Sequence, residues 1–248
     1  MTYNLRREET VDADQLRGML EESPGKAAQA ILAAAGQGVV QAQLLLGQIL
    51  LDGRGIERDL VLARQWFAIA AQGGSAMAHN MLGRCLEHGW GGEQDLEQAV
   101  VHYRTAAQAG LDWGLYNYAN MLGTGRGVAQ DQAGAFAAYR RAAQDGHAKS
   151  MNLLGRYLEL GIACDADFTR ARRWYRRSAQ AGDFRGQFSH AAVLADQGEV
   201  GEALGWLRRA LEAGNANFLR SSIAELEKAG DARVRGMAER YRERLGEM

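Results

Sequence analysis

Proline and cysteine are scarce in this chain of 248 residues, and neither sign of charge dominates. Pro24 is the only proline, and the formal net charge is -1. Because proline is the strongest helix breaker and alanine the best helix former, this alanine- and leucine-rich composition favours helix throughout. The two cysteines, Cys85 and Cys164, lie far apart in sequence, which is typical of reduced thiols and not of a disulfide framework. The balanced charge argues against a dedicated nucleic-acid binder.

Long hydrophobic runs are also missing. No stretch approaches the roughly 18 uninterrupted apolar residues that a membrane span needs. The basic residues near the N-terminus are not followed by an apolar run, so no secretory signal is visible. We therefore expect a cytoplasmic protein that makes no contact with membranes.

What the chain does have is a repeat of 36 residues. The segment GRGIERDLVLARQWFAIAAQGG, residues 53–74, realigns without a gap at residues 89–110, 125–146 and 161–182. Four columns recur in every copy: an aspartate (Asp59, Asp95, Asp131, Asp167), an alanine (Ala63, Ala99, Ala135, Ala171), an aromatic residue (Phe67, Tyr103, Tyr139, Tyr175) and a closing glycine (Gly74, Gly110, Gly146, Gly182). A fixed period of this length is typical of repeat architectures.

Each unit divides into two predicted helices. Apolar residues recur at helical spacing from Gln41 to Leu51, and Gly53 then ends the first helix. Asp59 stands where its side chain would cap the second helix, which Gly74 terminates. The glycine pairs therefore indicate a tight link between antiparallel helices. They do not indicate a phosphate loop, because no G-x4-G-K-[ST] motif is present.

The repeat resembles the Sel-1-like repeat family, a relative of the tetratricopeptide repeats. Residues 42–74 match its pattern A-x3-L-G-x2-(Y/L)-x2-G-x-G-(V/I)-x2-D-x3-A-x2-W-(Y/F)-x2-A-A-x2-G at nearly every position. Three later copies depart from it: His102 replaces the tryptophan, Tyr118-Ala119 replaces Leu-Gly, and Ala163 replaces the second loop glycine. The resemblance implies an all-α, right-handed superhelix of stacked helix pairs, with about 14 helices along this chain, and a role in binding other proteins.

The domain prediction is one solenoid over residues 1–248. N-terminal capping helices occupy 1–38, full repeats occupy 39–74, 75–110, 111–146 and 147–182, and C-terminal capping helices occupy 215–248. The fifth repeat, 183–214, is four residues shorter and has lost the glycine-containing connector. Irregular ends are expected, since terminal repeats present one face to water.

Motifs for catalysis or metal binding are lacking. No H-E-x2-H pair, Cys/His cluster with metal-ligand spacing or G-x-S-x-G elbow occurs, so we expect a non-enzyme without cofactor or metal. His190 stands in a core-facing column and is interpreted as a satisfied, buried or half-buried histidine, with a functional role as the alternative. The arginine-rich segment at 170–178 is interpreted as a solvated convex face, with nucleic-acid binding as the alternative.

The partner is predicted to bind in a concave groove lined by the first helices. The offsets that select the groove residues are borrowed from the resembling tetratricopeptide-type fold. Asparagine can grip a peptide backbone, cations can bind carboxylates and aromatic residues can serve as anchors. The predicted binding residues are Asn80, Arg84, Trp113, Tyr116, Asn120, Lys149, Asn152, Arg156, Arg185 and Phe188.

The sequence thus predicts a non-catalytic adaptor that binds a peptide or partner protein of some acidic character. Three alternatives remain open: a small-ligand binder, a hydrolytic Sel-1-like protein, and a regulatory nucleic-acid-associated protein that uses the arginines at 170–177. A further possibility is that the groove-facing residues are simply soluble surface.

Overall fold

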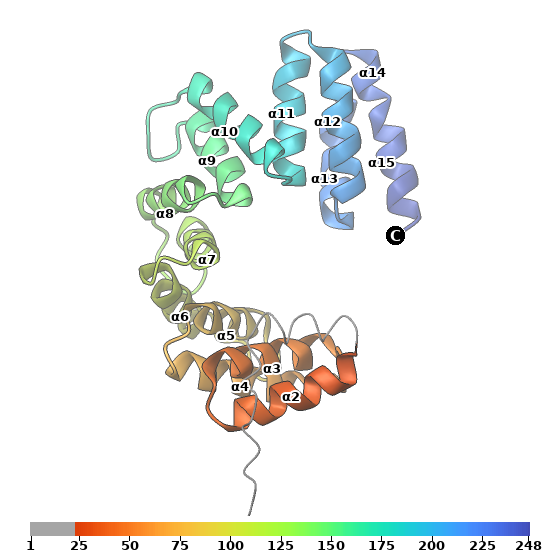
Figure 1. Cartoon of the computed structure of the whole chain (residues 1–248). Helices are drawn as coiled ribbons and strands as arrows, with labels where there is room; N and C mark the ends of the chain where they lie inside the picture. Colours follow the sequence, from red (N-terminus) through yellow and green to blue (C-terminus); the bar gives the residue numbers. More distant parts are fainter. Residues whose placement is uncertain (1–22) are drawn as a thin grey trace, which may run out of the picture. The chain divides into compact units, whose positions relative to one another are not determined.

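The computed structural model describes residues 23–248 of the chain, shown in Figure 1. This part of the chain is all-helical, with thirteen helices of ten or more residues and one of four. It divides into two compact units, Met1–Gly114, described from residue 23, and Leu115–Met248. Together these elements form an all-α repeat solenoid, as the periodicity predicts.

In the first unit, consecutive helices pack against one another in chain order. They are α2 (Pro24–Gly36), α3 (Val40–Asp52), α4 (Leu60–Gln72), α5 (Ala76–His88) and α6 (Leu96–Gln108), followed by the start of α7 (Asp112–Thr124). Helix α2 begins at the single proline, which suits a first helical turn because no N–H is needed there. The rest of the predicted N-terminal cap, residues 1–22, lies outside the described residues.

The second unit continues the same pattern and ends in a tighter bundle. It contains the rest of α7, α8 (Gln132–Gln144), α9 (Ala148–Leu160), α10 (Phe168–Gln180), α11 (Phe184–Asp196), α12 (Val200–Ala213), α13 (Ala216–Glu227), α14 (Ala232–Arg235) and α15 (Met237–Gly246). Helix α13 packs on α15, and α12 contacts both α14 and α15. The C-terminal helices therefore cover the face of the fifth repeat that a sixth repeat would otherwise bury.

The predicted helix caps are confirmed in all four full repeats. The Asp59 carboxylate accepts a hydrogen bond from the backbone N–H of Leu62 at 2.9 Å, and Asp95, Asp131 and Asp167 do the same for the residue three positions later. In the shortened fifth repeat, Glu199 occupies the N-cap position of α12 and makes no such bond.

The paired glycines of the connectors also have their predicted structural role. Gly53 ends α3 in the left-handed conformation, with φ of 71°, and Gly55 follows with φ of 77°. In the fourth repeat the second glycine is replaced by Ala163, which adopts the same left-handed conformation with φ of 57°. That conformation costs a residue with a Cβ roughly 1–2 kcal/mol, so this connector retains the repeat geometry at a local energetic cost.

The aromatic column fills the interior of each helix pair. Phe67, Tyr103, Tyr139 and Tyr175 are buried, and three of them face a glycine on the preceding helix. A Cβ placed on Gly155, for example, would lie 2.5 Å from Cε1 of Tyr175. The small residue and the ring are thus complementary, and both are needed for the helices to approach closely.

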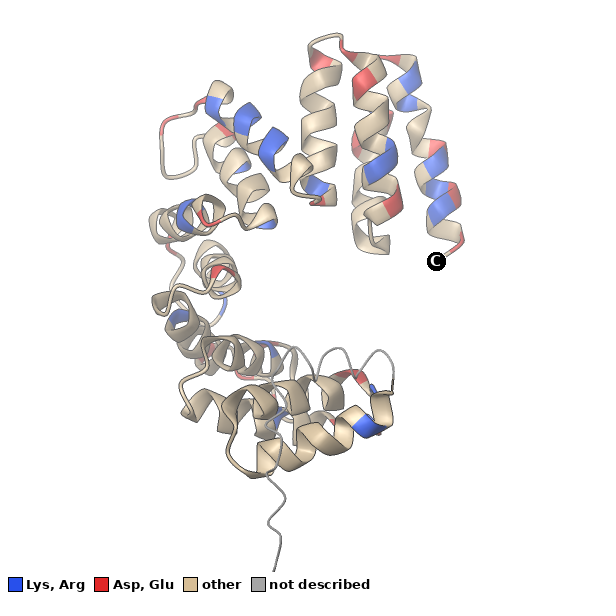
Figure 2. Ribbon diagram, viewed as in Figure 1, with Lys and Arg blue, Asp and Glu red and all other residues tan. Residues whose placement is uncertain are grey.

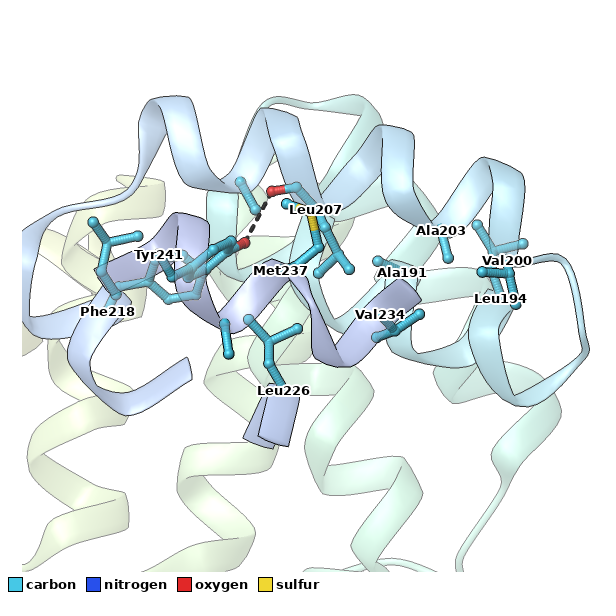
Figure 3. Packing of buried hydrophobic residues seen from close by; sticks show 13 residues of the cluster. Ala191, Leu194, Val200, Ala203, Leu207, Phe218, Leu226, Val234, Met237 and Tyr241 are labelled. Carbon is cyan, nitrogen blue, oxygen red and sulfur yellow. Dashed lines mark hydrogen bonds between the residues drawn. The ribbon is translucent and has the colours of Figure 1, made fainter. Parts of the chain in front are cut away.

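The C-terminal core is drawn in Figure 3. Apolar residues of α11 to α15 form one buried cluster, with Leu219 and Tyr241 completely inaccessible. The Tyr241 hydroxyl donates a hydrogen bond to the Leu207 carbonyl at 2.9 Å, so the buried polar end of the ring is satisfied. This bond connects the last helix to the fifth repeat. Within residues 23–248, no helix is both long and apolar enough to cross a membrane.

Candidate binding pocket on α9, α11 and α13

Three of the predicted binding residues lie in the first unit. Asn80 on α5 is buried, with 3% of its surface exposed. The Arg84 guanidinium lies over the Trp90 ring, 5.0 Å from its centroid. Trp113 is the most exposed of the three, at 39%. Of these residues, only Trp113 therefore presents a large apolar surface to solvent.

Three further predicted residues, on α7 and α9, make contacts within the second unit. The Lys149 ammonium lies 6.0 Å from the centre of the Tyr116 ring, and that ring also packs against His147. The Asn120 side chain accepts a hydrogen bond from the Tyr139 hydroxyl at 2.7 Å. Asn120 therefore satisfies a buried member of the aromatic column, a structural role that sequence analysis did not assign to it.

The remaining four predicted residues line one pocket of about 490 Å³. Asn152 and Arg156 come from α9, and Arg185 and Phe188 come from α11. We call this cavity the α11 pocket; its other lining residues are Glu159, Tyr175, Ser189, Ala192, Val193, Asp196, Phe218, Ser221, Ser222 and Glu225. All of them belong to the second unit, so the pocket is formed within a single compact body.

Asn152 has hydrogen-bonding capacity that the fold does not use. The residue is 4% exposed, and its Oδ1 is buried without a hydrogen-bond partner among the described residues. A buried polar atom without a partner costs about 1–3 kcal/mol relative to a satisfied one. Asn152 therefore lines the pocket with an oxygen whose hydrogen-bonding capacity is unused among the described residues.

The pocket's carboxylates differ in how far they are already engaged. Glu159 accepts a hydrogen bond from the Tyr175 hydroxyl at 2.6 Å, and burial together with this bond raises the pKa of Tyr175. Glu225 forms an ion pair with Lys228 at 3.2 Å. Asp196 makes no hydrogen bond or ion pair with any residue in the described part of the chain. One carboxylate of three thus remains available.

Both arginines of the pocket are exposed and lack a carboxylate partner among residues 23–248. Arg156 makes no hydrogen bond there, and the Arg185 guanidinium stacks over Phe184, 4.7 Å from the ring centre. Stacking of this kind leaves the guanidinium N–H groups able to donate in the ring plane. After internal pairing, the free charge of the pocket is therefore positive.

An aromatic cluster forms the apolar part of the pocket. Phe188 meets Phe218 edge to face, with ring centres 5.7 Å apart, and also approaches Tyr241 at 6.4 Å. A neighbouring cavity of about 430 Å³ shares Phe188, Ala192, Asp196 and Glu225 with the α11 pocket and extends it along α11 and α13. The two cavities thus adjoin and form one groove whose lining is both apolar and charged.

The wall that α13 contributes to the pocket was not predicted from the sequence. Phe218, Ser221, Ser222 and Glu225 lie in the segment that was predicted only as a C-terminal cap. Continuing the Phe188 column by the fifth-repeat length of 32 residues leads to Arg220, which does not line the pocket. The repeat register is lost after Gly214, so no column could have identified these residues.

The interpretation of His190 is half right. The residue is buried, 7% exposed, as its core-facing column predicts. It is not satisfied, because its Nδ1 has no hydrogen-bond partner in the described part of the molecule. Burial lowers the pKa of His190, Glu202 opposes this effect and Arg176 adds to it.

A second histidine contact was also not predicted. His79 and His102 come from α5 and α6, and their Nδ1 atoms are 2.9 Å apart. Burial lowers the pKa of both rings, which favours a neutral pair with one N–H between them. Within residues 23–248 no group of three or more His, Cys, Asp or Glu side chains is arranged to hold a metal ion.

The chain is similar to a known repeat family in sequence and to solved proteins in structure. The sequence model of the Sel1 repeat matches residues 40–75, 76–111, 114–147, 148–183 and 195–215, more than half of the chain. No curated protein matches in sequence.

Two solved structures are similar along most of the chain. A Sel1 repeat protein from Oxalobacter formigenes has a TM-score of 0.79 and 24% identity, with 96% of this chain and 97% of that chain covered. The protective antigen c5321 of uropathogenic Escherichia coli has a TM-score of 0.70 and 26% identity. The match to c5321 covers 96% of this chain but spans only 54% of that protein.

A third structure is more distant. The immunity protein PA5088 of Pseudomonas aeruginosa has a TM-score of 0.58 at 17% identity, with 84% of this chain and 82% of that chain covered. At that identity the similarity extends to the fold alone.

Proposed function

The chain belongs to the Sel1 repeat family, and from that membership we propose that it is a non-catalytic adaptor that binds an extended peptide segment of a partner protein in the α11 pocket. Sel1 repeat proteins are typically protein-interaction scaffolds. The observation that carries the proposal is the meeting of Asn152, Arg156 and Phe188 in one groove, with the amide oxygen of Asn152 unpaired.

The three side chains offer complementary kinds of contact. Asn152 can accept from a peptide backbone N–H, because its oxygen has no competing internal donor. Phe188, held edge to face by Phe218, offers a rigid ring surface for an apolar anchor. The geometry suits a segment that crosses α9, α11 and α13 and places alternate side chains in the groove.

The charges favour a partner with acidic character. Arg156 and Arg185 lack carboxylate partners among the described residues, whereas two of the three carboxylates are already engaged. A carboxylate of the partner would therefore find unpaired guanidinium groups. Asp196 supports a segment that also carries one basic residue. In the first unit, Trp113 is a separate candidate contact, because it exposes a large apolar surface.

The cytoplasm is the proposed location. Both cysteines are free, Cys85 is completely buried, and Cys164 is half-buried. Free thiols are typical of proteins from a reducing compartment. An adaptor of this kind would act on soluble partners and needs neither metal nor cofactor.

The test starts from random peptides displayed on phage and selected on the full chain. The selected sequences should be enriched in Asp and Glu beside an apolar anchor. The tightest peptide, measured by calorimetry, should bind Asn152→Ala and Arg156→Gln about tenfold more weakly, the effect of losing one charge-assisted or otherwise unreplaced hydrogen bond.

Two matched controls separate binding from stability. Gln187 on α11 also has a buried, unpartnered side-chain oxygen but does not line the pocket, so Gln187→Ala should bind like the unaltered protein. Arg208 on α12 is exposed and also lies outside the pocket, so Arg208→Gln controls for net charge. Equal affinities for all four variants would refute the site, and the absence of any selected peptide would refute the function.

A further inference from the structure

A second polar groove lies on the other side of α11 and shares only Val193 with the α11 pocket. It is a cavity of about 310 Å³ between α10, α11 and α12. Arg172, Arg173 and Arg176 of α10 line it together with His190 of α11, and Val193 and Leu194 form its apolar side. We call it the α10 groove. The cationic helix α10 is visible in Figure 2.

None of these three arginines is neutralised internally. Each is exposed, and none makes a hydrogen bond or an ion pair with any residue between 23 and 248. The other two arginines on the exposed side of α10 are engaged, since Arg170 pairs with Asp167 and Arg177 lies over Trp174. The unpaired cations are thus the ones that face the groove.

The fourth polar group of the groove is buried and unsatisfied. His190 is 7% exposed, its ring meets Trp206 edge to face, and its Nδ1 lacks a partner within the described chain. Glu202, across the groove, accepts a hydrogen bond from the Trp206 indole N–H at 3.3 Å. The groove therefore combines three free guanidinium groups with an imidazole, and one carboxylate faces them.

The equivalent groove of the first unit has a less cationic lining than the α10 groove. At the matching positions, Arg64 is retained but Gln65, Ala68 and Leu82 replace two arginines and the histidine. Arg64 is also occupied, because its Nη1 donates to the Glu93 carbonyl of the connector at 3.2 Å. The scaffold by itself therefore requires neither the extra cations nor the histidine.

The shortened fifth repeat explains why Arg172, the counterpart of Arg64, is free. The four-residue deletion removes the connector that would carry the carbonyl equivalent to that of Glu93. Instead, the short turn ending at Glu199 leads directly into α12, and Gln197 borders the groove. Loss of the connector thus opens this end of α10 and releases its arginine.

We propose that the α10 groove binds the phosphate group of a phosphomonoester. Guanidinium groups match phosphate oxygens in geometry and can donate in a bidentate manner. A phosphomonoester carries a charge of about -1.5 to -2 near neutral pH, which three arginines opposed by one glutamate can neutralise. A ligand with a single carboxylate, in contrast, would leave part of the positive charge of the groove uncompensated. Val193 and Leu194 then contact the organic part of the ligand.

Histidine titration gives a readout that a merely cationic surface would not produce. A bound dianion next to His190 stabilises its imidazolium form against the burial and the Arg176 charge that disfavour it. By linkage, the pKa of His190 rises when the anion binds, and a dianion of constant charge binds more tightly as the pH falls. Arg172, Arg173, Arg176 and Glu202 are the charged groups that line the groove around the ring.

The experiment follows the histidine Cε1–H signals of the full chain by NMR during titration with phenyl phosphate and with inorganic phosphate, at constant ionic strength. Sulfate, whose charge is constant over this pH range, serves as the pH-invariant dianion. Saturable binding of phenyl phosphate and a raised His190 pKa are expected. Inorganic phosphate should bind more weakly, because it lacks the apolar contacts. Equal affinity for the two would point to free phosphate as the ligand and overturn the phosphomonoester assignment.

Two double variants distinguish the groove from the net charge of the helix. Arg172→Gln/Arg176→Gln should weaken binding about tenfold or more, since each removes charged hydrogen bonds. Arg170→Gln/Arg177→Gln removes the same charge from the same helix outside the groove and should leave binding unchanged. Equal loss in both variants, or an unmoved His190 pKa, would overturn the proposal. So would binding of single-stranded oligonucleotides without any binding of phenyl phosphate, because that result would identify a nucleic-acid surface.

Discussion

Replacing Gly155 by alanine tests whether the glycine and aromatic columns hold each repeat together. The added Cβ would lie 2.5 Å from Cε1 and 2.7 Å from Cδ1 of Tyr175, both far inside contact distance. The ring cannot easily move away, because it is 3% exposed and its hydroxyl is bound to Glu159. Overpacking of this kind costs typically about 1–3 kcal/mol, and the rigid surroundings favour the upper end.

Helix propensity acts in the opposite direction and sets the net magnitude. Alanine is better than glycine inside a helix by about 1 kcal/mol, so the expected net loss for Gly155→Ala is about 2 kcal/mol. Gly205 in α12 provides the matched control, since a Cβ there meets nothing within 4 Å. Gly205→Ala should therefore gain up to about 1 kcal/mol.

Urea denaturation of both variants, followed by circular dichroism, measures the difference in the free energy of unfolding, and thermal denaturation measures the shift in Tm. For a chain of this size, about 1 kcal/mol corresponds to a shift in Tm of roughly 2–4 °C, so Gly155→Ala should melt several degrees lower than Gly205→Ala. If both variants are stabilised to a similar degree, the Tyr175 ring does not need the space that glycine leaves at position 155. The account of the aromatic column would then be wrong.

Three further predictions concern a helix cap, the cysteines and the effect of acid. Asp167→Ala should lower the free energy of unfolding by about 1 kcal/mol in urea titrations, because it removes the cap of α10. Glu199→Ala removes no cap bond and should leave this free energy unchanged, so equal effects of the two variants would contradict the capping argument. Burial raises the pKa of Cys85 to about 11. With a thiol reagent at neutral pH, the half-buried Cys164 should therefore react in the native protein and Cys85 only after unfolding. Reaction of both thiols at the same rate would refute this prediction. Burial lowers the pKa of His190 in the folded protein, so the ring is protonated first in the unfolded chain as the pH falls. The stability that comes from keeping this ring neutral is therefore present above about pH 6.5 and lost below it. Unfolding titrations across this range should show a smaller acid loss for His190→Gln; an identical loss would exclude the histidine as its source.

The fold was largely predictable because its determinants are local and repeated. Asp59 caps a helix with its own neighbouring N–H groups, and Gly53 ends one through its own φ angle. Each of these effects depends on a few consecutive residues, so four registered copies specify the same helix pair four times. The C-terminal bundle lacks this repetition, and only its helices, not their contacts, could be predicted.

The binding residues were predictable only in part. Four residues selected by column, among them Asn152 and Phe188, do meet in the α11 pocket. Asn120 was predicted in the same way, but its side-chain oxygen accepts a hydrogen bond from the Tyr139 hydroxyl instead. The columns give the side of the helix on which a residue lies, and they cannot give the partners that compete for its polar atoms.

By itself, the sequence determined the helical repeat, its caps and its connectors, because these follow from the propensities and hydrogen bonds of residues close together in the chain. The tertiary structure alone decided that α13 completes the α11 pocket, that Asn152 and His190 remain unsatisfied, and that the groove-facing arginines of α10 are free. Whether a buried polar atom is paired depends on distances between helices far apart in sequence. A deletion of four residues changes those distances, even though both flanking helices still form.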